Sequence, residues 1–392
     1  MSGIGTADEL IASAAKFTGL SDFGDDSGDS YREGLLALVE SYASDESLTE
    51  KGVKAARAMT RGALMARLAS QSAWTANPEH ADVAIERPVF VTGLPRTGTT
   101  ALHRLLVADP SHQGLELWLA EMPKPRPPRD TWASDPVYQM IEAGVKRHQV
   151  SWPEFLGVHE LGAVQVEECW QLLRQSFRSV SFECLAHLPS YSSWLAGQDW
   201  TAAYQRHRRN LRLIGLPDAG KRWVLKNPSH LFALDALLAA YPDALVVVTH
   251  RSPRTAIASA CSLAAQATAG WSETFRGDVI GAGQLELWAR GMDLFSASRA
   301  RYDQARFCDV AYEDFVADPL GTVESIYARF GLALGAEAAS EMRALVAADA
   351  AARSGGSEAP ARRPAHRYSL AEFGLTGEQV DERFSAYLAA RA

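Results

Sequence analysis

The amino-acid sequence predicts a three-layer α/β fold, with a central parallel sheet flanked by helices. Three short apolar runs support this fold class, because each is followed by a helical pattern: RPVFVTG by TTALHRLLV, RWVLK by LFALDALLAA, and ALVVVTH by residues 254 to about 265. A fourth run, RFCDVAY, precedes a helix predicted over residues 319–330. Alternating strands and helices are typical of parallel sheets, because each helix carries the chain back across the sheet.

Additional helical segments surround this core. Residues 1–86 predict a helical N-terminal extension, since apolar residues recur at three- and four-residue spacing over 7–16, 31–42 and 48–72. The α/β core is predicted over residues 87–332, with a helical substrate-side insertion at about 130–215. Residues 333–392 form a C-terminal segment with a basic loop and a closing helix, and the whole chain is interpreted as one domain.

The amino-acid composition and net charge limit the classes of function that this protein can have. The chain has 392 residues, of which 47% are hydrophobic and 22% charged, as in ordinary globular proteins. Its net charge of -8 argues against nucleic-acid binding, which depends on a positive field. The cysteines form no CxxC pair and are interpreted as reduced thiols rather than metal ligands; they are Cys169, Cys184, Cys261 and Cys308.

The cellular location is predicted to be cytoplasmic. The first residues, MSGIGTADELIASAAKF, lack the basic and continuously apolar regions of a signal peptide. The sequence also contains no apolar stretch approaching the roughly 18 residues that a membrane span needs. The oligomeric state stays open, a homo-oligomer included.

A phosphate-binding loop is the strongest motif. GLPRTGTT, at residues 93–100, lies between a predicted strand and a predicted helix, where backbone N–H groups and the helix dipole bind anions. Its glycine spacing equals that of GxxxxGK[ST], which makes the fold P-loop-like, but Thr99 replaces the lysine that phosphoryl transfer uses. Arg96 instead supplies a cation, and Thr97 and Thr100 supply hydroxyls. The structural alternative is a simple Gly-Pro turn.

A second anion site is predicted in HRSPRTAIAS. His250 and Arg251 follow a buried strand, at the sheet edge where α/β proteins bind ligands. Ser252 is a good N-cap and Pro253 a good first helical residue, so Arg251 lies beside a helix N-terminus. Ser259 lies two turns into this helix and could share the anion. The alternative is a surface arginine and a packed serine.

The two motifs together resemble the sulfotransferase family that uses 3′-phosphoadenosine 5′-phosphosulfate (PAPS), and especially its bacterial members. PRTGTT resembles the 5′-phosphosulfate loop, HRSPRTAIAS the 3′-phosphate segment, and HRYSLAEFGLT the last nucleotide-side loop. The resemblance implies that PAPS is the co-substrate, that 3′-phosphoadenosine 5′-phosphate (PAP) is released, and that no metal or redox cofactor is used. It implies nucleotide contacts from Arg96, Thr97, Gly98, Thr99, Thr100, Arg251, Ser259 and Arg367.

The segment WVLKNPSHL contains two candidate catalytic residues. Sulfuryl transfer needs a base for the acceptor proton and a positive charge at the leaving oxygen. Lys226 ends a predicted strand and suits the second role, whereas His230 opens the next helix and suits the first. Animal cytosolic members have K-x-H-L at the equivalent position, whereas this chain has K-N-P-S-H-L.

Carboxylates are alternative bases, because some relatives use glutamate. The candidates are Glu116, Glu167 and Glu168. In HELGAVQVEECWQLLRQSF, Glu167 and Glu168 either stabilise the start of an amphipathic helix or place one carboxylate in the acceptor pocket. His159 is a further candidate in the same segment.

The acceptor is predicted only by chemical class. Aromatic side chains are dense in the middle segment: Trp170, Phe177, Phe182, Tyr191, Trp194, Trp200 and Tyr204. Such residues are usually core, but if some line a pocket the acceptor is a small apolar or aromatic hydroxyl compound, such as a phenol, a sterol-like alcohol or a lipid. Two other functions stay open: a P-loop small-molecule kinase and a non-catalytic nucleotide-binding module.

Overall fold

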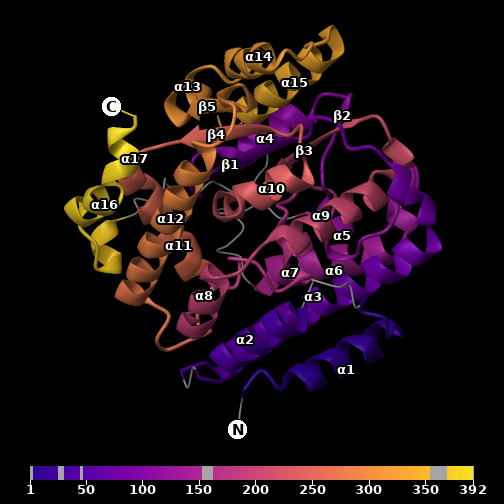
Figure 1. The fold of residues 1–392 in the computed structure, drawn as a ribbon, viewed down its shortest axis with the longest axis vertical. Helices are drawn as coiled ribbons and strands as arrows, with labels where there is room; N and C mark the ends of the chain where they lie inside the picture. The colour runs from indigo at the N-terminus through magenta and orange to yellow at the C-terminus, as the bar shows by residue number, and fades with distance from the viewer. Residues whose placement is uncertain (1–2, 25–30, 45–46, 152–161, 354–368, 392) are drawn as a thin grey trace.

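The sheet is parallel, as the sequence predicts. The computed structural model describes residues 3–24, 31–44, 47–151, 162–353 and 369–391. Within these ranges five strands form one sheet in the order β2-β3-β1-β4-β5, and every neighbouring pair is parallel (Figure 1). The strands are β1 (Val89–Gly93), β2 (His112–Gln113), β3 (Arg222–Lys226), β4 (Leu245–His250) and β5 (Phe307–Ala311).

Strand β1 occupies the centre of the sheet and pairs with β3 on one side and β4 on the other. Val91 lies opposite both Lys226 and Val247, so the carboxyl ends of these three strands meet at one edge. Every residue of β1 is buried, which explains its continuous apolar sequence. The loop that follows β1 therefore lies between the segments that follow β3 and β4.

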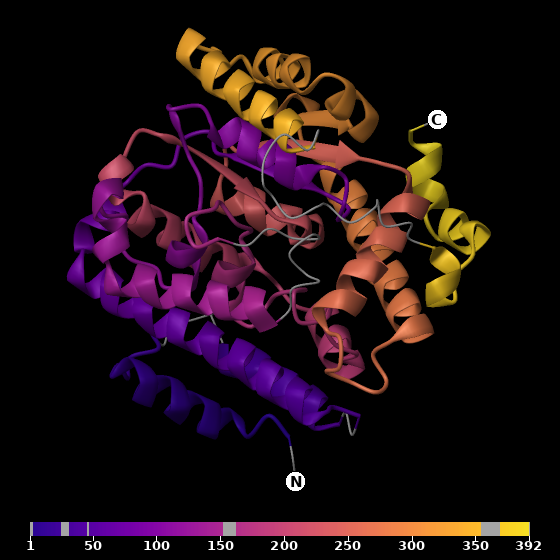
Figure 2. The same cartoon turned by 180° about the vertical axis from the view of Figure 1, so that it is seen from behind.

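One face of the sheet is covered by α4 (Thr99–Val107), α13 (Tyr312–Ala317), α14 (Pro319–Phe330) and α15 (Ala336–Arg353). In Figure 2 the purple helix α4 lies beneath the gold helix α15. The side chains that fill this layer include Val89, Val91, Leu102, Leu106, Val247, Val323 and Phe330. Because Phe90 belongs to the core on the opposite face, β1 shows the alternation expected of a strand between two helical layers.

The opposite face is covered by α9 (Thr201–Ile214), α10 (Leu234–Ala240), α11 (Pro253–Ala267) and α12 (Gly277–Arg299). The N-terminal helices form a further layer below them in Figure 1: α1 (Ala7–Thr18), α2 (Tyr31–Ala43) and α3 (Glu50–Ala76). These three helices agree with the sequence prediction to within a few residues. A capping box of Thr6 and Glu9 begins α1, and Gly19, at φ 69°, ends it.

The other helices connect these layers. They are α5 (Leu117–Glu121), α6 (Pro136–Ser151), α7 (Trp170–Arg174), α8 (Pro189–Ala196), α16 (Gly377–Arg383) and α17 (Ser385–Ala389). Short 3₁₀ turns are η1 (Pro78–Asp82), η2 (Arg129–Ser134), η4 (Leu216–Asp218), η5 (Pro228–Phe232), η6 (Gln304–Arg306) and η7 (Leu370–Phe373). Within the described ranges, no helix is both long and apolar enough to span a bilayer.

Two differences from the sequence prediction have clear physical reasons. Strand β2 has only two residues, too few to produce a periodic pattern. Helix α12 was missed because it contacts α10, α11, η5, η7, α16 and α17, so its apolar residues are not confined to one stripe. The described cysteines carry free thiols, as expected: Cys169 and Cys261 are buried, and Cys184 and Cys308 are half-buried.

Candidate functional site

The phosphate loop forms a tight turn between β1 and α4. Gly93, at φ 142°, lies so close to β4 that a Cβ atom there would be 2.4 Å from the carbonyl oxygen of Thr249. Gly98, at φ 86°, is the N-cap of α4 and has no side chain that could cap the helix. Arg96 has φ 69°, in the left-handed region that non-glycine residues rarely adopt. The first N–H groups of α4 therefore have no side-chain cap, which is the arrangement in which a helix N-terminus can bind an anion.

The three threonines of the loop have different surroundings. Thr97 is buried, and its Oγ1 lies 2.6 Å from both the Leu94 carbonyl oxygen and Oγ1 of Thr249. Its hydroxyl therefore ties the loop to β4. Thr99 is buried at the start of α4, whereas the half-buried Thr100 accepts a hydrogen bond from Nζ of Lys226 at 3.1 Å.

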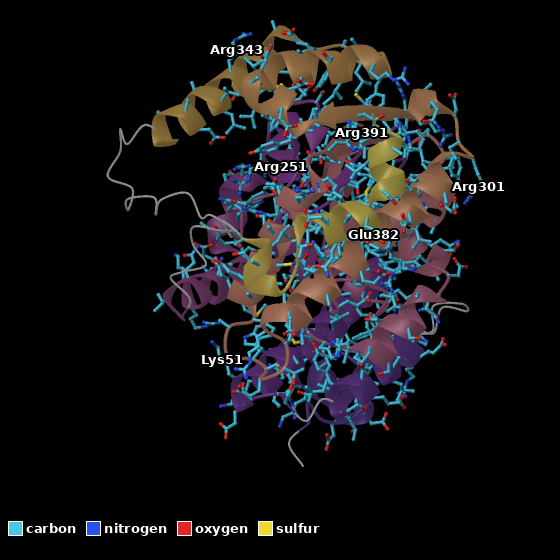
Figure 3. The ribbon with its side chains drawn as sticks, turned by 90° about the vertical axis from the view of Figure 1, so that its left-hand side faces the viewer. Lys51, Arg251, Arg301, Arg343, Glu382 and Arg391 are labelled. Carbon is cyan, nitrogen blue, oxygen red and sulfur yellow. The ribbon has the colours of Figure 1, made fainter. Side chains whose placement is uncertain are left out.

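The two predicted anion motifs lie in direct contact. Nε of Arg96 donates a hydrogen bond to Oγ of Ser259 at 3.1 Å, and Nη1 of Arg251 donates to the carbonyl oxygen of Arg96 at 3.0 Å. Ser252 is the N-cap of α11 and Pro253 its first residue, as the sequence predicts. Figure 3 labels Arg251 below the layer that carries Arg343 of α15. Two cations from separate strand ends thus converge beside one loop.

Lys226 connects the phosphate loop to a carboxylate. It is the last residue of β3, its side chain is 1% exposed, and its Nζ contacts Oε1 of Glu168 as well as Oγ1 of Thr100. The N–H of Cys169 donates to the Lys226 carbonyl oxygen at 3.2 Å, which holds the Glu168 segment against the end of β3. A mostly buried ion pair therefore lies at the start of α4.

Glu167 belongs to the same buried region. Its backbone N–H donates to the Leu115 carbonyl oxygen at 2.8 Å, and its Oε1 accepts a hydrogen bond from the N–H of Glu168 at 3.0 Å. Nearby, burial raises the pKa of Glu121, while the charge of Arg174 acts in the opposite direction. Helix α7 begins only at Trp170 with Cys169 as its N-cap, so both glutamates precede the helix.

His230 lies in an aromatic cluster beneath the sheet. It is 1% exposed, its Nδ1 is 2.7 Å from the hydroxyl of Tyr204, and its ring packs edge-on against Phe90 at 5.1 Å. Burial lowers its pKa well below the ordinary value, and neighbouring His207 acts in the same direction, so His230 is neutral near pH 7. Within the described part of the chain, its Nε2 has no hydrogen-bond partner.

The remaining candidates lie apart from this cluster. Glu116 forms a buried ion pair with Arg126 at 3.0 Å, and Arg126 also contacts Asp218 at 2.7 Å. His159 and Arg367 fall outside the described residues. His250 contacts the hydroxyl of Tyr387 at 2.9 Å and Asp309 at 2.6 Å, so its ring connects β4 to β5 and the C-terminal helix α17.

Sequence reasoning missed two residues of the site. Thr249 holds the loop through Thr97, and Tyr312 packs its ring 4.0 Å from Cζ of Arg251. Tyr312 follows β5 directly, so the rule that ligands bind at the carboxyl ends of parallel strands could have identified it. The central aromatic residues are mainly core, as expected, and only Trp170 and Trp194 are half-buried.

Other surface features lie away from the loop. An open groove of about 670 Å³ between α12 and the C-terminal helices is lined by residues that include Leu285, Glu286, Arg383 and Ala386. Among the described residues, none of the predicted site residues lines this groove. In the same described ranges, no three His, Cys, Asp or Glu side chains gather closely enough to hold a metal ion.

Comparisons with known proteins agree with this architecture. Sulfotransferase STF1 from Mycobacterium tuberculosis has a TM-score of 0.89 and 56% sequence identity, covering 98% of this chain and 100% of that one. Sulfotransferase STF9 from Mycobacterium avium has a TM-score of 0.83 and 28% identity, covering 98% and 96%.

A curated relative is more distant. Omega-hydroxy-beta-dihydromenaquinone-9 sulfotransferase Stf3 from Mycobacterium bovis is 26% identical over 263 residues. The match covers 64% of this chain and 64% of the relative, so the chain spans less than two thirds of that relative's length.

The profile of the sulfotransferase family matches residues 88–335, more than half of the chain. This range includes the loop at residues 93–100 and the segment around Arg251. The resemblance found in the sequence is therefore confirmed, and the chain belongs to the sulfotransferase family.

Proposed function

We propose that this protein transfers a sulfuryl group from PAPS to the hydroxyl of a small, apolar acceptor. The observation that carries the proposal is the convergence of Arg96, Arg251 and Lys226 on the turn before α4. Three cations beside a helix N-terminus suit a ligand with more than one anionic group. Since Thr99 replaces the usual lysine, this arrangement favours an adenosine with separate 3′ and 5′ groups over a nucleoside triphosphate.

The donor fits the residues present. Gly98 is the N-cap of α4 and no side chain caps this helix, so Arg96 and the residues 97–100 would hold the 5′-phosphosulfate beside its first N–H groups. Arg251 and Ser259 would hold the 3′-phosphate, because both contact Arg96 at the edge of the same loop. Bound PAPS supplies the sulfuryl group and a phosphate leaving group.

Lys226 and Glu168 have complementary proposed roles. Lys226 touches Thr100 of the loop, so its ammonium would stabilise the negative charge that develops on the leaving oxygen. Glu168 contacts the same ammonium and would accept the acceptor's hydroxyl proton as the new S–O bond forms. Glu168 is the preferred base because Lys226 links it directly to the loop. His230 is the second candidate, because it is neutral and could take up a proton. It ranks below Glu168 because its ring contacts Tyr204 and Phe90.

The acceptor is proposed to be a lipid-like or aromatic alcohol. Trp170 follows Glu168 by two residues and is only half-buried, which supports an apolar environment for the acceptor near the proposed base. The name of the relative Stf3 describes a hydroxylated dihydromenaquinone as its acceptor, which supports the same chemical class. A highly charged glycan fits this apolar environment poorly.

Nucleotide binding is the first test. In a thermal-shift titration, PAP is expected to stabilise the protein more than ATP with Mg²⁺ does, and a ligand at 100 times its Kd adds about 2.7 kcal/mol to the free energy of unfolding. Arg251→Ala should reduce the PAP effect without unfolding the protein. A larger response to ATP with Mg²⁺ would contradict the proposal and favour a kinase.

Catalysis is the second test. The protein, PAPS and a panel of hydroxyl compounds, beginning with phenols and hydroxylated isoprenoid quinones, should give a product that is heavier by one SO₃ in mass spectrometry. PAP binding without a sulfated product from any acceptor would favour the non-catalytic module. Sulfation of polysaccharides alone would overturn the acceptor class.

A further inference from the structure

Helix α7 carries a half-buried face next to the proposed base. The helix packs against α3, α5 and α9 (Figure 1). Leu172 and Leu173 are buried in this packing, whereas Trp170, Gln171 and Arg174 are only half-buried. An α-helix has 3.6 residues per turn, so residues one and four positions after Trp170 lie on its side of the helix. The three half-buried side chains therefore share one face, which solvent reaches.

Arg174 is held at only one part of its guanidinium. Its Nε donates a hydrogen bond to Oγ of Ser181 at 2.8 Å, and its Cζ lies 5.9 Å from the ring centroid of Phe182. Within the described ranges its two Nη groups make no hydrogen bond. A guanidinium has five N–H donors, so those of both Nη groups are available to a ligand.

Glu121, the last residue of α5, supplies an opposite charge near Arg174. Burial raises the pKa of Glu121 and lowers that of Arg174, and in each case the charge of the other residue is the strongest opposing influence. Both residues belong to the described part of the chain, where they form no ion pair with each other. A cation with available donors and a carboxylate thus act on each other electrostatically without being in contact.

This pair lies in the same region as the proposed base. Burial raises the pKa of the half-buried Cys184 well above its ordinary value, the charges of Glu183 and Glu168 act in the same direction, and that of Arg174 opposes them. One thiol is therefore within electrostatic range of both the base and Arg174. Along α7, Arg174 lies one turn beyond Trp170, about 6 Å along the helix axis. An elongated molecule at Glu168 can thus extend along this face to Arg174.

A hydroxyl group suits the pair better than a charged group. Its oxygen accepts a hydrogen bond from Arg174, and its hydrogen is donated to the carboxylate of Glu121. Both bonds involve a charged partner, which makes them stronger than bonds between neutral groups. An anionic ligand would be repelled by Glu121, and a cationic one by Arg174.

From this arrangement we propose that Arg174 and Glu121 form a second polar subsite of the acceptor region, which binds an uncharged hydroxyl at the end of the acceptor remote from the sulfated oxygen. The inference rests on the proposed function, because it presupposes that the acceptor lies beside Glu168. It deepens that function by defining the acceptor as an apolar molecule with a hydroxyl at each end.

The experiment measures binding of acceptors to the protein saturated with PAP, so that it does not depend on turnover. The probes are 4-phenylphenol and 4,4′-biphenol, which differ by one hydroxyl at the far end of the same ring system. Isothermal titration should show 4,4′-biphenol binding about tenfold more tightly, after correction for its two equivalent orientations.

Arg174→Met removes the donors and keeps an apolar stem. It should reduce the preference for 4,4′-biphenol to about twofold or less and change the affinity for 4-phenylphenol by no more than about threefold. Arg174→Gln replaces it if the methionine variant does not fold. The matched control is Arg209→Met, because Arg209 is also half-buried and packs on an aromatic ring, 4.0 Å from that of Trp74. This control should keep the full preference.

Glu121→Gln supplies a second readout, which a loss of packing alone would not produce. The probe is 4′-hydroxybiphenyl-4-carboxylic acid, which is ionised at neutral pH. It should bind the wild type more weakly than 4,4′-biphenol does. In Glu121→Gln its affinity should rise about tenfold, because the repelling charge is gone.

Each outcome decides one part of the inference. Equal affinities of the wild type for the two phenols would overturn it, and so would equal losses for both phenols in Arg174→Met. Tighter binding of the carboxylic acid than of 4,4′-biphenol to the wild type would exclude a hydroxyl as the ligand. If neither phenol binds, the proposed acceptor class fails together with the subsite. A preference for 4,4′-biphenol without any sulfated product from PAPS would instead contradict the proposed function and support the subsite.

Discussion

The side chain of Arg96 donates a 3.1 Å hydrogen bond to Ser259, a residue 163 positions later in the chain. Arg96 belongs to the loop after β1, and Ser259 belongs to α11 after β4. The bond joins the segments that follow two adjacent strands, so the two anion motifs of the sequence are in direct contact. A ligand with two anionic groups can therefore contact both motifs at once.

Ser259 should contribute less to nucleotide binding than Arg251. Ser259→Ala removes a neutral hydroxyl, whose hydrogen bond contributes about 0.5–1.5 kcal/mol, so PAP affinity should fall about 2- to 13-fold. Arg251→Ala removes a charged donor and should cost more than tenfold. Calorimetric titration measures both. Ser262→Ala, one turn further along α11, is the matched control and should bind PAP normally. Loss of affinity only in the control would contradict the assignment.

Lys226 should affect both turnover and stability. Lys226→Met removes the charge opposite the leaving oxygen, so kcat should fall about 10²- to 10³-fold. It also leaves the Glu168 carboxylate without its ammonium, and breaking a buried ion pair costs about 3–5 kcal/mol. Urea unfolding and single-turnover kinetics measure these effects. The double variant with Glu168→Gln should regain part of the lost stability and none of the activity. Full activity in Lys226→Met would exclude the proposed role.

The two candidate bases can be separated directly. Glu168→Gln removes the proton acceptor with little change of shape, so kcat should fall about 10²- to 10⁴-fold while PAP affinity changes only a few-fold. His230→Asn should lower kcat less than tenfold, because the His230 ring packs in the aromatic cluster with Tyr204 and Phe90. Steady-state kinetics and PAP titration of both variants give the comparison. The reverse order of kcat losses would assign the base to His230.

Acid should destabilise the protein through buried histidines. Burial lowers the pKa of His103 and of His207 from 6.5 to about 3. The pKa of each histidine is lower in the folded protein than in the unfolded chain. The contribution of each neutral ring to the free energy of unfolding is therefore complete above about pH 6.5 and is lost as the pH falls toward 3. At pH 5 each histidine should lower the free energy of unfolding by about 2 kcal/mol.

Urea unfolding between pH 7.5 and pH 5 measures this dependence. His103→Gln keeps a donor for the Val224 carbonyl oxygen, which His103 contacts at 3.0 Å, but it cannot take up the proton. The variant should therefore show a smaller loss of stability on acidification. An identical pH slope in the variant and the wild type would mean that His103 is not a source of the effect.

The local patterns of the sequence were sufficient to predict the central strands and the helices that follow them. The strand, glycine turn and helix around Arg96 are contiguous, and so are the strand that ends at Lys226 and the strand that precedes Arg251. Because parallel strands place their carboxyl ends at one edge, these patterns also predicted that the three cations converge. Backbone preferences and apolar burial act over a few residues, so they are visible in one segment of sequence.

The tertiary structure alone decided which side chain contacts which. The sequence predicted Thr97 as part of the anion-binding loop, but only the structure shows that its hydroxyl contacts the Leu94 carbonyl oxygen and Oγ1 of Thr249. Glu168, rather than Glu116, meets Lys226, because the N–H of Cys169 docks this segment on β3 while Arg126 engages Glu116. These outcomes depend on distances between residues far apart in the chain. No periodicity or motif encodes such a distance, since it is set only when the layers pack.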